Sequence, residues 1–270
     1  MKRSFLYFLA ACAIVLIGCN GAVIIRAPKM NSVIMDISGV TVFWERNDEI
    51  EGSSEFAGYN VYVYTDSSAL VNLDGEDLNK FNGQVVTDTM FHVYGLSQDS
   101  IYYFQVRAVN IEDKVGGYND ETPFMTASPR PEFEVTLYVS FDPGSPTDSC
   151  AIRFYDALIV ADSLMGDSAA DMWIRASGDT VWVVSPAEYP GLLLPRETMF
   201  VNMGSGDFDS IAVVTLEPNT EDSEVAVGEL VIGKTQDDNY VKMRIEAIDT
   251  INGTIAILYA YQNVVGFPYF

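Results

Sequence analysis

The chain has 270 residues, of which 49% are hydrophobic, and its formal net charge at pH 7 is −23. A surface this acidic repels the phosphates of nucleic acids and anionic lipid headgroups, so we expect no nucleic-acid partner. The single histidine and three cysteines cannot form a Cys/His zinc cluster or a two-histidine haem site, and we expect no metal and no cofactor.

The first residues of the chain predict a signal peptide. Lys2 and Arg3 form a short positive head, and the apolar run from Phe5 to Ile17 has the length of a signal-peptide core. This run is too short to cross comfortably a hydrocarbon core that takes about 20 helical residues. We therefore expect an exported protein.

The apolar run ends in a cysteine. The order Leu16-Ile17-Gly18-Cys19 resembles the lipobox of bacterial lipoproteins, although its isoleucine is bulkier than the residue usual there. The resemblance implies that residues 1–18 are cleaved off, that Cys19 is lipidated, and that residues 19–29 tether the protein to a membrane. Two or three acyl chains give a stable anchor. Residue 20 is not the aspartate associated with inner-membrane retention, so we expect the outer membrane or the cell surface. An ordinary secretory peptide or an uncleaved anchor is the alternative.

Residues 30–128 predict a first β-domain. Apolar and polar residues alternate along short runs that end at turn-forming residues, as in antiparallel strands. Three motifs stand out: Trp44, then Gly58-Tyr59-Asn60-Val61, then Leu96 shortly before the run Tyr102–Ala108. Together they resemble the fibronectin type III module. The resemblance implies a β-sandwich in which Trp44 is buried and the Tyr102 hydroxyl bonds to nearby backbone. The neighbours expected around Trp44 are Tyr59, Val61, Phe104 and Val106.

Two features of this half stand apart from the motifs. A long stretch, Ser67 to Thr89, separates two strand-like runs and is expected to decorate one edge of the sandwich. His92 alternates with inward-facing Phe91 and Val93, so we expect it to face water with no partner that the sequence can name. A Ser-His-Asp catalytic site would need this histidine, and we expect no catalytic residues of that kind.

The second half, residues 131–270, predicts another antiparallel β-domain, a sandwich or barrel-like. The boundary is expected in residues 127–133, where two prolines flank an arginine between strand-like runs. The one short helix candidate is Asp162 to Asp171. Cys150 is expected to be a small buried residue at the start of a strand. The fold class is therefore all-β, with two domains in series.

Four residues of the second half are candidates for ligand binding. Trp173, flanked by Asp171 and Arg175, is the more open tryptophan, whereas Trp182 shares a face with Val184 and is expected in the core. On the strand from residue 240 to 245, Tyr240, Lys242 and Arg244 should share the displayed face, with Val241, Met243 and Ile245 turned inward. A ring beside two cations could hold an acidic sugar or a carboxylate of a partner. Pairing of these cations with acids on adjacent strands is the alternative.

The sequence favours a non-enzymatic, lipid-anchored envelope protein that binds a carbohydrate or a protein partner through its second half. A carbohydrate-active enzyme with a carboxylate pair in that half, or a purely structural part of an envelope complex, is the alternative. The acidic stretches at residues 72–77 and 235–240 resemble calcium loops only in part and are interpreted as turns.

The anchor gives the first prediction. Cys19→Ser should leave the chain unprocessed or release it from membranes, because no thiol remains to carry the lipid. Fractionation and gel migration of the two forms would check this. A variant that fractionates and migrates like the wild type would contradict the lipoprotein prediction, and Cys150→Ser serves as the matched control.

Overall fold

The computed structural model describes residues 27–46, 51–139, 149–166 and 169–270. The expected signal peptide, Cys19 and most of the expected tether lie outside these residues. Among the described residues, no helix is long and apolar enough to cross a membrane.

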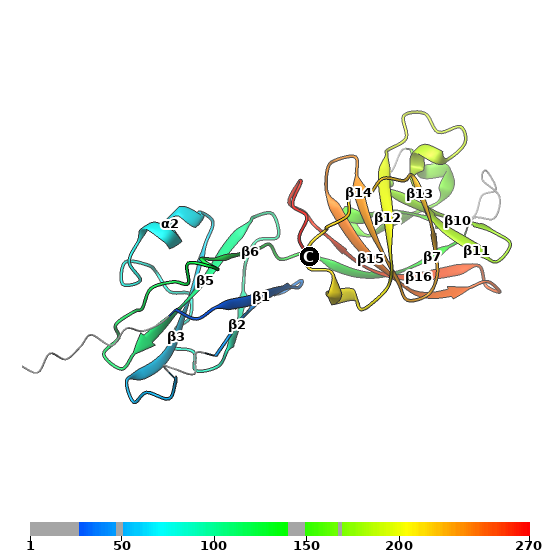
Figure 1. Cartoon of the computed structure of the whole chain (residues 1–270). Coiled ribbons are helices and arrows are strands. Elements are labelled where there is room, and N and C mark those ends of the chain that lie inside the picture. The colour runs from blue at the N-terminus through cyan, green and yellow to red at the C-terminus, as the bar shows by residue number, and fades with distance from the viewer. Residues whose placement is uncertain (1–26, 47–50, 140–148, 167–168) are drawn as a thin grey trace, which may run out of the picture.

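The described chain is all-β and forms two β-sandwiches in series (Figure 1), which confirms the expected fold class. The first sandwich packs two three-stranded antiparallel sheets, one of strands β1, β2 and β4 and one of strands β3, β5 and β6. The bounds are β1 Met30–Met35, β2 Gly39–Trp44, β3 Phe56–Tyr64, β4 Met90–Tyr94, β5 Tyr102–Asn110 and β6 Met125–Ala127.

The core between these two sheets forms around Trp44. The Trp44 ring meets the Tyr59 ring edge-on with centroids 5.4 Å apart. Val61, Phe104 and Val106 belong to the same buried cluster, so the expected neighbours are confirmed. The Tyr102 hydroxyl accepts a hydrogen bond from the Ser97 amide at 2.9 Å, which confirms the expected bond to local backbone.

The stretch from Ser67 to Thr89 packs along the free edge of β3, as expected, through isolated bridges between Tyr59 and Val86 and between Tyr62 and Lys80. It contains a helix that the sequence pattern did not predict, α2, Ser67–Asn72. The carbonyls of Leu70 in its last turn and of Leu73, directly after the helix, accept hydrogen bonds from the buried Arg107 guanidinium. Carbonyls in the last turn of a helix have no intrahelical donor, so this arginine holds the helix against the sheet.

His92 is half-buried, not free in solvent as expected. Its Nδ1 lies 2.9 Å from the Thr41 hydroxyl, and its Nε2 lies 3.2 Å from the Ser38 hydroxyl. Thr41 is its direct cross-strand neighbour on β2. The sequence alternation correctly predicted that Val93 points inward, but it could not show which hydroxyl groups the neighbouring strand places beside the ring.

The second sandwich packs two five-stranded antiparallel sheets, in the orders β13-β11-β10-β8-β9 and β12-β14-β15-β16-β7. The bounds are β7 Glu132–Tyr138, β8 Ala151–Arg153, β9 Leu158–Val160, β10 Met172–Ser177, β11 Thr180–Val184, β12 Thr198–Ser205, β13 Asp222–Val225, β14 Glu229–Thr235, β15 Tyr240–Asp249 and β16 Thr254–Tyr261. The expected helix at residues 162–171 is a 3₁₀ turn over Asp162–Leu164. Cys150 is fully buried directly before β8, as expected.

Each sheet of the second sandwich is also covered on its outer face. Between the sheets lies the main core, which includes Val241, Met243 and Ile245 of the central strand β15. Behind β15, residues 206–219 and the C-terminal residues 262–270 cross the sheet and pair with each other through the bridge between Val213 and Tyr269. Strands buried on both faces leave little room for a displayed polar face.

The segment between the two sandwiches is buried. Ser128, Pro129, Arg130 and Pro131 are all buried, which the two prolines and the arginine of the expected boundary did not indicate. The Arg130 amide donates to the Asp36 carbonyl of the first sandwich at 3.3 Å. Its guanidinium pairs with Glu132 and lies over the Phe208 and Phe270 rings of the second sandwich. One residue therefore contacts both sandwiches.

The packing of the first sandwich gives a prediction. Trp44→Ala should lower the free energy of unfolding by about 3–5 kcal/mol, because it leaves a cavity where a large buried ring was. Tyr94→Ala is the control, since this ring is 66% exposed, and it should change stability by about 0.5 kcal/mol or less. Urea unfolding followed by fluorescence would measure both, and equal losses would contradict the central role of Trp44.

Candidate functional site

Trp173 is not displayed, and its interpretation as the more open tryptophan was wrong. The residue is fully buried on the outer side of β10. Its indole Nε1 donates to the Ser185 carbonyl at 3.0 Å, and its ring meets the Tyr189 ring edge-on. Residues after β11 fold back over this sheet and cover the ring. The charged residues Asp171 and Arg175, two positions to either side in the sequence, gave no sign of this cover. Trp182 is half-buried at the edge of the same cluster.

Tyr240 and Lys242 are also buried, so the expected display of this strand face was wrong. The Lys242 ammonium donates to the Ile211 carbonyl at 3.1 Å and lies over the Phe208 ring at 4.5 Å. The Tyr240 hydroxyl donates to Glu217. Alternation correctly separated the two faces of β15, but it could not show that irregular chain covers the second face.

Arg244 lies at the margin of this covered face. Its guanidinium pairs with Glu246 at 3.2 Å and is about a third exposed. The alternative interpretation was pairing with acids on adjacent strands, whereas Glu246 is on the same strand, β15, two residues after Arg244. Among the described residues, therefore, Trp173, Tyr240, Lys242 and Arg244 do not come together as one exposed binding face.

A cleft of about 520 Å³ opens instead where one end of the second sandwich meets the first. Its size is within the range of small-ligand pockets, about 300–1,000 Å³. One of its walls is Asp99, in the loop between β4 and β5 of the first sandwich. The remaining walls come from the second sandwich: Arg153, Tyr155, Ala169, Asp171, Arg196, Asp237, Asn239, Tyr261 and Asn263.

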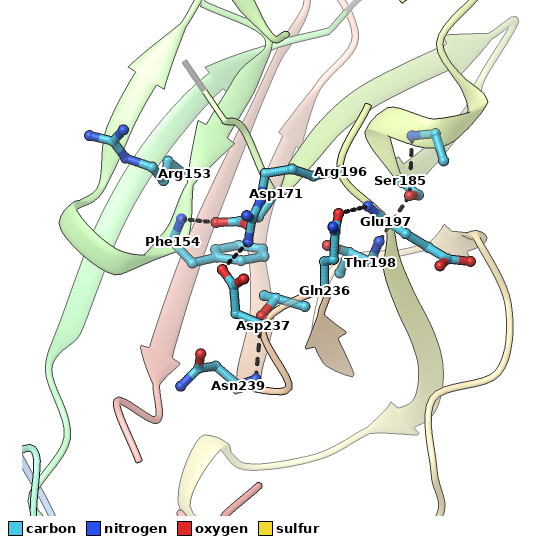
Figure 2. A network of polar contacts seen from close by, with 12 residues as sticks. Arg153, Phe154, Asp171, Ser185, Arg196, Glu197, Thr198, Gln236, Asp237 and Asn239 are labelled. Carbon is cyan, nitrogen blue, oxygen red and sulfur yellow. Dashed lines mark hydrogen bonds and ion pairs between the residues drawn. The ribbon is translucent and has the colours of Figure 1, made fainter. Parts of the chain in front are cut away.

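Three charged residues form the floor of the cleft, and Figure 2 shows them joined in a row. Asp171 directly precedes β10, Arg196 precedes β12, and Asp237 lies in the turn between β14 and β15. The Arg196 Nε donates to Asp171 at 2.9 Å, and its Nη2 donates to Asp237. This arginine therefore ties three strand ends together across the end of the sandwich.

Asp171 has no free carboxylate oxygen. One oxygen accepts from Arg196, and the other accepts from the Phe154 amide at 2.9 Å. Burial raises the pKa of Asp171, while the bonds from Phe154 and Arg196 act to lower it. Burial also acts to lower the pKa of Arg196, but the carboxylates of Asp237 and Asp171 outweigh it and raise that pKa. A general acid or nucleophile needs an accessible oxygen, and Asp171 has none. We therefore interpret Asp171 as a residue that holds Arg196 and the Phe154 amide in place.

The polar groups at the mouth of the cleft are arranged differently. The Asn263 amide nitrogen donates to Asp99 across the junction at 3.1 Å. A carboxylate can only accept, so this contact assigns the nitrogen and places Oδ1 on the other side of the amide. That Oδ1 is buried and has no hydrogen-bond partner among the described residues. The amide nitrogen of Asn239 donates both its hydrogens, to the carbonyls of Gln262 and Asn263.

Two tyrosine rings complete the walls. Tyr155 follows β8 in a 3₁₀ turn and is 64% exposed, whereas Tyr261 ends β16 and is buried. Burial raises the pKa of Tyr261, and nearby Asp171 and Asp237 raise it further, so its hydroxyl keeps its proton. The cleft thus offers one accessible ring, that of Tyr155, beside a tyrosine that is buried.

Little in the sequence pointed to this cleft. Its residues are scattered from 99 to 263, and no spacing connects them. The one signal was the acidic turn at residues 235–240, interpreted as a turn with a partial likeness to a calcium loop. In the structure the turn's carboxylates face cations, Asp237 with Arg196 and Asp238 with Lys234. The described residues contain no group of three or more His, Cys, Asp or Glu side chains placed to hold a metal ion.

A scan against protein-family models found no match for this chain, and a search of curated proteins found none either. The resemblances to bacterial lipoproteins and to the fibronectin type III module therefore remain predictions.

Buried Lys242 gives a pH-dependent prediction. Burial, reinforced by the nearby charge of Arg130, lowers the pKa of Lys242 to about 7, whereas an unfolded lysine titrates near about 10.4. Between these values the unfolded chain holds a proton that the folded chain lacks, so the stability contributed at this position rises with pH. Below about pH 7 the folded and the unfolded chain both hold the proton, and the buried charge of Lys242 destabilises the folded state to its full extent.

Lys242→Met should therefore be more stable than the wild type at neutral pH, and the difference should shrink by about 1.4 kcal/mol per pH unit between about pH 7 and about pH 10. Urea unfolding across this range would measure it. Lys80→Met, at an exposed lysine, is the control and should show no such trend. A stability difference that stays constant with pH would contradict the predicted charge state of buried Lys242.

Proposed function

We propose that the protein is a lipid-anchored, non-enzymatic binding protein of the cell envelope, and that it holds a small ligand in the cleft between its two sandwiches. The observation that carries the proposal is the cleft itself, which joins hydrogen-bonding groups from both sandwiches with an exposed aromatic ring. Pockets of this kind occur preferentially where domains meet. The Cys19 motif supports the placement at a membrane, with the outer membrane or cell surface favoured.

The contacts of the carboxylates favour binding over catalysis. A glycoside hydrolase needs two carboxyl groups that act on substrate from opposite sides. Here Asp171 and Asp237 are held by the same guanidinium, and both oxygens of Asp171 are occupied by protein donors. The carbohydrate-active enzyme is for this reason the weaker interpretation, while a carbohydrate remains one of the ligand classes that hydrogen-bonding walls and a ring can hold.

An assembly role is the second candidate. Leu193 and Leu194 are 89% and 96% exposed at the tip of one loop, and Leu194 has a positive φ of 56°. A left-handed leucine is uncommon, and two adjacent exposed leucines offer an apolar contact point to a protein partner. This loop directly precedes Arg196, so a partner seated on it would lie beside the cleft.

Thermal unfolding of the full chain in detergent, in the presence of a panel of neutral, acidic and basic small molecules and oligosaccharides, would test the proposal. A ligand of the cleft should raise the melting temperature of the wild type, and Tyr155→Ala should remove most of that rise. Tyr94→Ala is the matched control, since these tyrosines are 64% and 66% exposed. The ligand should be recovered chemically unchanged.

Three outcomes would contradict the proposal. A panel without any stabilising compound would favour the assembly role. Equal responses of the Tyr155→Ala and Tyr94→Ala variants would place binding outside the cleft. Conversion of the ligand, seen by mass spectrometry, would favour the enzyme.

A further inference from the structure

Around the cleft, carboxylates outnumber guanidinium groups even after the ion pairs between them are counted. Arg153 is held by Asp156 through two hydrogen bonds, from Nε at 2.9 Å and from Nη2 at 2.6 Å. Arg196 is shared between Asp171 and Asp237. Among the described residues, the carboxylates of Asp99, Asp156, Asp171 and Asp237 outnumber the guanidinium groups of Arg153 and Arg196 by two.

The excess charge lies where a ligand can reach it. Asp99 and Asp237 are both exposed. Asp99 uses one oxygen to accept from Asn263, and Asp237 uses one to accept from Arg196. Each carboxylate can accept further hydrogen bonds, whereas Asp171 is buried and each of its oxygens already accepts from a protein donor.

The two asparagine amides of the cleft, those of Asn239 and Asn263, also favour a ligand that donates hydrogen bonds. Asn263 lines the cleft with a buried Oδ1 that lacks a partner among the described residues. The amide hydrogens of Asn239 are both spent on backbone carbonyls, and the amide nitrogen of Asn263 is turned to Asp99. The amides of this cleft therefore offer acceptors more readily than donors.

We propose that the cleft binds a primary ammonium group, with Asp99, Asp237 and the Oδ1 of Asn263 as its acceptors. An ammonium carries one positive charge and three donors, which suits two exposed carboxylates and one unpaired amide oxygen. The exposed ring of Tyr155 lines the same cleft, and the face of a tyrosine attracts cations within about 6 Å. The ammonium belongs to a free amine or to a lysine side chain of a peptide, and the chemistry of recognition is the same for both.

This inference rests on the proposed function and makes it more specific, because it selects one charge class of ligand. An acidic sugar, which the sequence had suggested for Tyr240, Lys242 and Arg244, is disfavoured here, since the two arginines of the cleft are already neutralised by carboxylates. Because Asp99 belongs to the first sandwich and Asp237 to the second, a bound ammonium would also join the two sandwiches.

Calorimetric titration of the full chain in detergent with putrescine, butanediol and succinate tests the charge class, because these molecules have the same number of carbon atoms. Putrescine should bind at least about tenfold more tightly than butanediol, as charge-assisted hydrogen bonds exceed neutral ones. Succinate should not bind, and added salt should weaken the binding of putrescine. Butanediol binding as tightly as putrescine, or a preference for succinate, would overturn the proposal.

Variants test the acceptors. Asp99→Asn and Asp237→Asn should each lower the affinity for putrescine about tenfold. Asp179→Asn, at the exposed tip of the β10–β11 hairpin, removes the same charge away from the cleft and should leave the affinity unchanged. Asp99→Asn lies in an exposed loop, so it remains informative even where Asp237→Asn disturbs Arg196. Equal losses in all three variants would show a general charge effect and overturn the site.

The source of the ammonium is decided with a blocked tripeptide that carries a central lysine and its counterpart with acetyl-lysine. Binding of the first but not the second shows that a peptide side chain is accepted, while binding of putrescine alone shows a free amine. If neither amine binds but the wider panel yields a ligand that depends on Tyr155, this inference fails and the proposed function stands. If the panel yields no ligand, the proposed function fails as well.

Discussion

The structure depends on a sheet that is buried on both faces. Strand β15 is hydrogen-bonded to β14 and β16, with Val241, Met243 and Ile245 in the main core. Its opposite face carries Tyr240 and Lys242, which would be exposed without the cover of residues 206–219 and 262–270. This requirement folds the end of the chain back across the sheet.

The covering segments also determine how the two sandwiches meet. Phe208 and Phe270, which cover Lys242, are the rings over which Arg130 lies between the sandwiches. The return of the chain after β16 brings Asn263 to Asp99 of the first sandwich. The same packing that completes the second core therefore buries the connection and forms one wall of the cleft.

The cleft combines rigid and accessible parts. Arg196 fixes its floor through Asp171 and Asp237, and this contact ties together strand ends that are distant in sequence. Its mouth keeps the exposed carboxylate of Asp99 and a buried amide oxygen without a partner among the described residues. Polar groups held in place by their neighbours are suited to recognition, because little ordering is required when a ligand binds.

The sequence by itself determined the strand content, the two domains in series, the inward faces around Trp44 and β15, and the burial of Cys150. These follow from the two-residue alternation of a strand and from motifs within a few residues of one another. It did not determine that Trp173, Tyr240 and Lys242 are covered, that 128–131 is buried, or that Asp99, Asp171, Arg196, Asp237 and Asn263 share a cleft. Only the tertiary structure decided these, because each depends on irregular segments that cross a sheet from a distant part of the chain, and alternation identifies the two faces of a strand but not what covers each face.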